Sequence, residues 1–148
     1  GGREAMRQAY REVPIAEVIA RQTRVSLTDL RREQLTLFAG RETPQAVRDK
    51  LGQIVDAQEQ IAAMADDARN TQSSIDGLFK DQERLRENLK ALKTGAQDLQ
   101  LRNRYLDQLT KQENQIQSLR THIDEVNKNM ASAQARLGDL IATFAFGG

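Results

Sequence analysis

Apolar side chains recur every seven residues from about residue 43 to the end of the chain. In segment 43–93, one series starts at Val47 and a second starts at Lys50; six of seven and five of seven positions are apolar. Segment 99–145 repeats the pattern, with six of seven and five of six apolar positions. A repeat of this length is typical of helices that wrap into a left-handed coiled coil. The predicted seam residues are Val47, Ile54, Ile61, Ile75, Leu78, Leu85, Leu109, Ile116, Leu119, Ile123, Val126, Met130, Leu137 and Leu140.

A short interruption at 93–98 separates the two helical segments, which are nearly equal in length. Gly95 suits the position after a helix end, and Asp98 suits the N-cap of a following helix. A short loop between helices of equal length makes them antiparallel neighbours. The sequence therefore predicts an all-α fold, a long antiparallel two-helix coiled-coil hairpin over residues 43–146 with its turn near 94–98. We expect it to form a rod.

Two registers keep both seams in contact across such a hairpin. One places Gln82 opposite Gln112 and Ile75 opposite Leu119, whereas the other places Gln82 opposite Tyr105. A buried amide needs a hydrogen-bond partner, so we expect the first register. Lone polar layers of this kind fix the register of a coiled coil at some loss of stability.

Residues 1–42 lack the seven-residue pattern and form an N-terminal appendage of mixed character. Candidate elements are one strand within residues 13–27 and a short helix from Thr28 to Gly40. A lone strand leaves its backbone edge unpaired, so any partner strands would come from another copy or from outside this sequence.

Composition narrows the chemistry that the chain supports. Its 148 residues carry 22 Lys and Arg against 21 Asp and Glu, with one His and no Cys. The absence of Cys excludes disulfides and thiolate ligands, and near-neutral charge argues against a dedicated nucleic-acid binder. His122 and Glu125 form an H-x-x-E pattern, but further ligands for a metal are lacking. We predict no catalytic, cofactor-binding or metal-binding residues, no cofactor and no enzymatic activity.

Leucine and arginine side chains concentrate beside the predicted turn and are candidates for partner contact. Apolar residues that flank the seam, among them Phe79 and Leu106, widen the apolar stripe beyond what two helices can cover. Residues 1–40, a second copy or another domain are the alternatives for covering it. The candidate contact residues are Leu89, Leu92, Leu99, Leu101, Arg102 and Arg104.

The predicted function is a non-catalytic structural or protein-interaction element that acts as a spacer, docking arm or self-association module. The apolar end around Phe144 and Phe146 raises one alternative, an amphipathic element that binds membrane surfaces. A nucleic-acid-binding coiled coil is a weaker alternative. We expect Phe144 to close the seam against Val47, and we expect a protein partner or a homo-oligomer. No apolar run is long enough to span a membrane, and no signal peptide is recognisable.

Two stretches resemble the C-terminal region of the mucoidy-inhibitor-A-like family of uncharacterised bacterial proteins. They are Asp81-Gln-Glu-Arg-Leu-Arg-Glu-Asn-Leu89, and Arg104-Tyr-Leu-Asp-Gln-Leu followed by Gln112-Glu113 and Ile116. The resemblance covers about residues 12–146. It implies a helical hairpin that protrudes from a β-rich part preceding residue 1, and an export signal upstream. It implies no catalytic residue.

Overall fold

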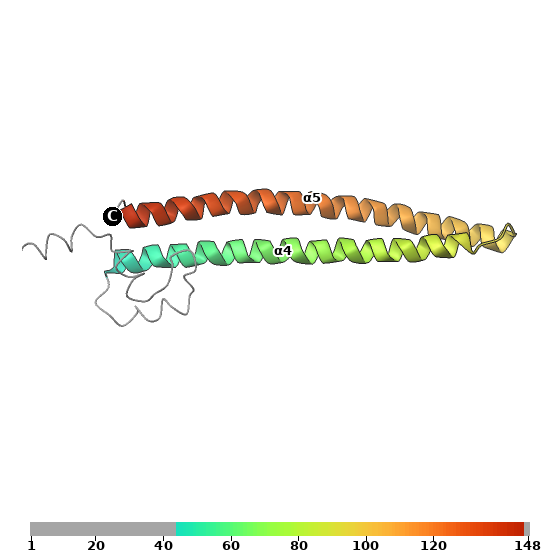
Figure 1. The fold of residues 1–148 in the computed structure, drawn as a ribbon, viewed down its shortest axis with the longest axis horizontal. Coiled ribbons are helices and arrows are strands. Elements are labelled where there is room, and N and C mark those ends of the chain that lie inside the picture. Colours follow the sequence, from blue (N-terminus) through green and yellow to red (C-terminus); the bar gives the residue numbers. More distant parts are fainter. Residues whose placement is uncertain (1–43, 147–148) are drawn as a thin grey trace, which may run out of the picture. The chain divides into compact units, whose positions relative to one another are not determined.

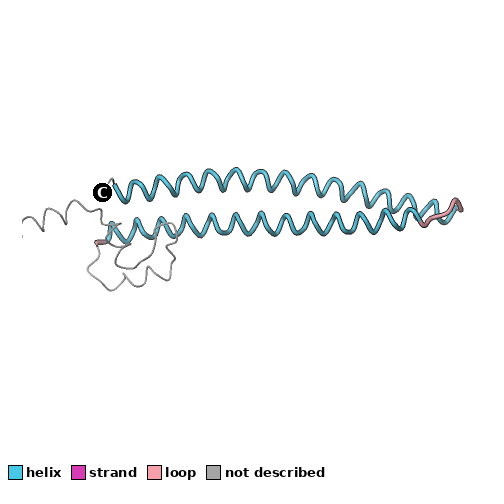
Figure 2. The backbone as a smooth tube through the Cα atoms, viewed as in Figure 1, coloured by secondary structure: helices cyan, strands magenta, loops and turns pink. Residues whose placement is uncertain are grey.

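The computed structural model describes residues 44–146; residues 1–43 and 147–148 lie outside that description, and with them the predicted appendage. Two helices account for almost all of the described chain. Helix α4 spans Gln45–Lys90 and helix α5 spans Ala96–Phe146. The two helices are joined by one short turn and run in opposite directions (Figures 1 and 2). The prediction of an all-α helical hairpin is confirmed.

The turn occupies residues 91–95, so the prediction of a turn at 94–98 was wrong by about three residues. Gly95 does not end the first helix. Its carbonyl accepts the hydrogen bond of the Leu99 amide at 2.9 Å, which makes Gly95 the N-cap of α5. The carboxylate of Asp98 lies inside the first turn of α5 and accepts a hydrogen bond from the Lys93 amide at 2.7 Å. An acidic side chain there also complements the positive end of the helix dipole.

The described hairpin divides into two compact units. The terminal unit comprises residues 45–62 and 131–146, and the turn unit comprises residues 63–130. In the terminal unit, Phe144 is buried in one cluster with residues of α4, in line with the expectation that it closes the seam beside Val47. The cluster consists of Val47, Leu51, Ile54, Val55 and Phe144, and partly buried Leu137, Leu140 and Ile141 pack against it.

The core of the turn unit follows the seven-residue pattern. Its buried side chains are Thr71, Ile75, Gln82, Leu85, Ile116 and Val126. The Thr71 hydroxyl donates a hydrogen bond to the Asp67 carbonyl at 2.7 Å, which satisfies the one hydroxyl in this core. All fourteen predicted seam residues are buried or half-buried.

The register in the turn unit follows from one hydrogen bond between the helices. The Gln112 amide donates to the Asp81 carboxylate at 2.5 Å, so Gln112 lies within one residue of the predicted position opposite Gln82. The alternative register would have moved Gln112 two helical turns away, beside Ile75. The packing therefore agrees with the predicted register, but the amide pairing that motivated it is not made: Gln112 bonds Asp81, and Nε2 of Gln82 has no hydrogen-bond partner.

Candidate interaction surface

The two sides of the turn unit differ in chemistry. Residues seven apart on a coiled-coil helix share one face, so each side can be followed as rows. Phe79 of α4 lines a hollow of about 310 Å³ together with Glu113, Ile116, Gln117 and Arg120 of α5. This hollow identifies the side that carries the row of Phe79 and the row of Glu113 and Arg120. We call it the apolar flank.

The large apolar side chains that are exposed within the described residues all belong to the apolar flank. They are Phe79, Leu106 and Leu99, with 39%, 47% and 54% of their surface exposed. Leu99 and Leu106 precede Glu113 and Arg120 at steps of seven residues, so one face of α5 carries all four. Contiguous exposed apolar patches mark interaction sites, and these three side chains are the candidates for one within the described residues.

Phe79 is held in place on this flank by a cation. The Arg120 guanidinium lies 5.5 Å from the centre of the Phe79 ring, within the range of a cation–π interaction. At an exposed site, such a contact contributes on the order of 0.5–1 kcal/mol. The ring is therefore oriented, yet more than a third of its surface stays open to a partner.

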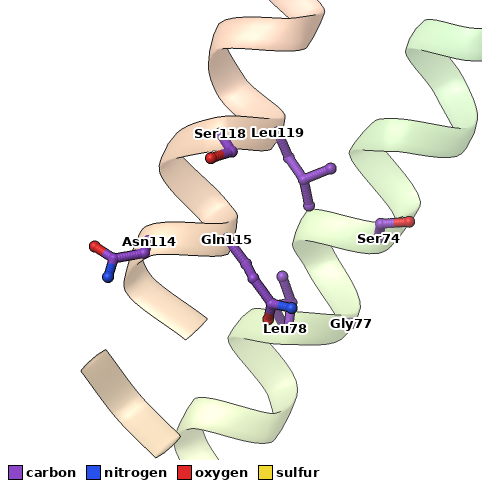
Figure 3. Close-up of a pocket in the computed structure, with 7 residues that line it drawn as sticks. All are labelled: Ser74, Gly77, Leu78, Asn114, Gln115, Ser118 and Leu119. Carbon is purple, nitrogen blue, oxygen red and sulfur yellow. The ribbon is translucent and has the colours of Figure 1, made fainter. Parts of the chain in front are cut away.

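The opposite side, which we call the polar flank, carries a shallow groove of about 670 Å³. Ser74, Gly77, Asn114, Gln115 and Ser118 line it, with Leu78 and Leu119 at its floor. Figure 3 shows Leu119 pointing from α5 toward α4, whereas Asn114 and Ser118 point away from the other helix. Small side chains open this groove, and most of its lining is apolar surface.

Hydrogen bonds between the helices concentrate on the polar flank. His122 Nε2 lies 2.9 Å from a carboxylate oxygen of Asp67 across the hairpin. The sequence offered no signal for this pair, because Asp67 and His122 are 55 residues apart. His122 therefore has a carboxylate partner on α4, and both side chains are about half exposed.

The carboxylate of Asp81 on this flank accepts two side-chain hydrogen bonds. The Arg84 side chain donates a hydrogen bond to its carboxylate at 2.9 Å, and the Gln112 amide donates another. These two hydrogen bonds, with the charge of Arg84, hold the pKa of Asp81 below its ordinary value. The hydrogen bond with Asp81 also raises the pKa of Arg84.

The predicted contact residues near the turn differ in exposure. Leu89, Leu92 and Leu101 are half-buried, whereas Leu99, Arg102 and Arg104 are exposed. Leu99 alone among these six belongs to the rows of the apolar flank. Phe79 and Leu106 were predicted only as flanking residues. Phe79 lies seven residues after Gln72, and Leu106 lies seven residues after Leu99. This spacing was the signal that could have assigned both residues to a contact surface.

Among residues 44–146, no three His, Asp or Glu side chains come together as a metal site would require. None of the described helices contains a stretch of 18 residues with the hydropathy of a membrane crossing.

Comparison with known proteins returns no match: no family model, curated protein or solved structure is significantly similar to this chain. The resemblance to the mucoidy-inhibitor-A-like family therefore stays a prediction.

Proposed function

We propose that this chain is a non-catalytic protein-interaction element, a helical hairpin that docks through its apolar flank. The observation that carries the proposal is the confinement of Phe79, Leu99 and Leu106 to one flank of the turn unit. The seam alone would keep the two helices paired without them. Their exposure lowers solubility unless they are covered, and covering them releases roughly 25 cal/mol for each Å² of apolar surface.

The polar flank supports the same proposal by contrast. Its rows carry Asp67 and Asp81 on α4 and His122 on α5, and these three make contacts between the two helices. A partner that approached this side would have to compete with those contacts. The apolar flank also carries such contacts, Arg69 with Asp66 and Gln72 with Asp76, and it differs in that Phe79, Leu99 and Leu106 are exposed there.

Site-specific photocrosslinking in cells that produce the protein tests this function directly. A benzoyl-phenylalanine residue replaces Phe79 in one variant and Gln115, on the polar flank, in a matched control. We expect a protein adduct from position 79 and none, or far less, from position 115. The mass of the adduct tells whether the partner is a second copy or another protein. Equal adducts from both positions, or none from position 79, would overturn the proposal.

A further inference from the structure

Two rows on α4 form a second seam beside the first. Ala65, Gln72 and Phe79 are spaced by seven, and Arg69 and Asp76 lie between them at steps of three and four. Ala65 is half-buried and the other four are exposed. Spacing of three and four residues is the spacing by which helices pack on one another. The five side chains therefore lie on one face of α4 outside the first seam, with Phe79 as its one large apolar side chain.

The residues of this second seam are self-complementary about Gln72. Arg69 lies three residues before Gln72 and Asp76 lies four residues after it. Ala65 and Phe79 lie seven residues to either side. An antiparallel second copy centred on the same residue sets each Arg69 within one residue of the level of the partner's Asp76, where this pair would replace the contacts that Arg69 makes with Asp66 and that Asp76 makes with Gln72. It also sets each large Phe79 level with the small side chain of the partner's Ala65.

Helix α5 carries a second self-complementary pattern on the same flank. Gln117 and Arg120 line the hollow beside Phe79. Asp124 follows Gln117 by seven residues, and Asn127 follows Arg120 by seven residues. An antiparallel copy centred between Arg120 and Asp124 sets Arg120 level with the partner's Asp124. Gln117 then lies level with the partner's Asn127, so charged residues meet opposite charges and amides meet amides.

The two centres lie at the same level of the hairpin. Asp81 is hydrogen-bonded to Gln112, and this contact ties the two helices together. Gln72 lies nine residues from Asp81 along α4 (81 − 72), and residue 122 lies ten residues from Gln112 along α5 (122 − 112). Both helices rise about 1.5 Å per residue, so the centres differ by about 1.5 Å. One two-fold axis therefore satisfies both patterns at once.

We propose that the part of the apolar flank around Phe79 is the interface between two copies of this chain, packed antiparallel about a two-fold axis at Gln72; Leu99 and Leu106 lie beyond the stretch in which the two turn units overlap. This inference rests on the proposed function and names the partner. A parallel dimer is disfavoured, because it sets Phe79 beside the partner's Glu113 and brings Glu83 near that same carboxylate. The carboxylates of Glu83 and Glu113 would repel each other, and the Phe79 ring would face the charge of the partner's Glu113.

The cysteine-free sequence makes the geometry testable by disulfide trapping. In the antiparallel dimer, Gln72 faces the partner's Gln72, so Gln72→Cys forms a disulfide-linked dimer under mild oxidation. Ser74→Cys, on the polar flank, is the matched control and stays monomeric on a non-reducing gel. In a parallel dimer, α4 faces the partner's α5, and Gln72→Cys does not crosslink.

Charge reversal provides a second measurement that needs no crosslink. Arg69→Asp sets two aspartates against each other twice per dimer, and we expect the dimer dissociation constant from sedimentation to rise roughly tenfold or more. Asp76→Arg does the same, and the double variant restores association because each pair becomes opposite again. Glu87→Lys, away from the apolar flank, is the control and leaves association unchanged.

The outcomes separate this inference from the proposed function. Trapping at position 72 with rescue by the double variant supports the antiparallel dimer. Dimerisation without trapping at 72 or without rescue overturns this arrangement, and a monomer at all concentrations overturns self-association. If photocrosslinking at position 79 then captures another protein, the docking function stands and the self-association inference fails.

Discussion

At the scale of single residues, the buried amides of Gln82 and Gln112 are the least satisfied groups of the hairpin. Gln82 is 1% exposed, and its Nε2 has no hydrogen-bond partner; neither has Oε1 of Gln112. A donor without an acceptor and an acceptor without a donor lie in one layer of the seam. Such a layer weakens the fold and disfavours other registers, because a shifted register would leave both amides among apolar side chains.

Replacing Gln82 with leucine removes a buried polar group and adds an apolar one. We expect Gln82→Leu to stabilise the hairpin by about 1 kcal/mol, seen as a higher midpoint of thermal unfolding by circular dichroism. Gln115→Leu, on the exposed polar flank, is the control and changes the midpoint little. A lower midpoint for Gln82→Leu would mean that the two amides bond to each other, contrary to this account.

Asp81 gives the hairpin a specific response to acid. Its pKa in the folded chain lies below the ordinary value of roughly 3.9, through the hydrogen bonds of Arg84 and Gln112. The stabilisation is therefore present above about pH 4 and is lost as the pH falls through the lowered pKa. We expect Asp81→Asn to unfold at a lower temperature than the wild type at pH 7, with the difference shrinking below pH 4. A difference independent of pH would contradict this role.

At the scale of elements, both helices are long, and their stability comes from the seam more than from helix propensity. Gly77 lies inside α4, and a methyl group added to it would meet no atom within 4 Å. Glycine in a helix interior costs about 1 kcal/mol relative to alanine. The helix therefore carries a weak point beside the groove of the polar flank.

Gly77→Ala is expected to stabilise the hairpin by about 1 kcal/mol in denaturant unfolding. Gly95→Ala serves as the opposite control. Gly95 caps α5, and alanine is a poor N-cap, so this variant should be neutral or destabilising. The same sign for both substitutions would show that the turn does not cap α5 as described.

The helices and their register followed from the seven-residue repeat, because seam residues such as Ile75 and Ile116 dictate which faces meet. The position of the turn was predicted less accurately than the helices. Gly95 and Asp98 each suit more than one position at a helix end, and local preferences do not distinguish a C-terminal glycine from an N-cap glycine. Val55, fully buried in the terminal unit, lies outside the repeat and was not predicted as core.

The candidate surface was harder to predict than the seam. Its apolar residues stand among polar ones, as Phe79 does between Gln72 and Arg86 in its own row. The patterns centred at residues 72 and 122 can be compared only when the offset between α4 and α5 along the hairpin is known. The contact between Gln112 and Asp81 supplied that offset.

At the scale of the whole molecule, net charge opposes association only weakly. The chain carries a formal charge of +1, so two copies repel each other little over long range. The proposed interface pairs four arginines with four aspartates near the surface. Such exposed pairs are screened by salt, so the association should weaken as ionic strength rises, while the apolar contacts of Phe79 persist.

Light scattering coupled to size-exclusion chromatography tests the central claim most directly, by comparing the wild type with Phe79→Glu and with Gln115→Glu on the polar flank. We expect a mass twice the 16.7 kDa of one chain for the wild type and for Gln115→Glu, and the mass of a single chain for Phe79→Glu. A wild-type mass of one chain at every concentration, or a Phe79→Glu variant that still dimerises, would contradict it.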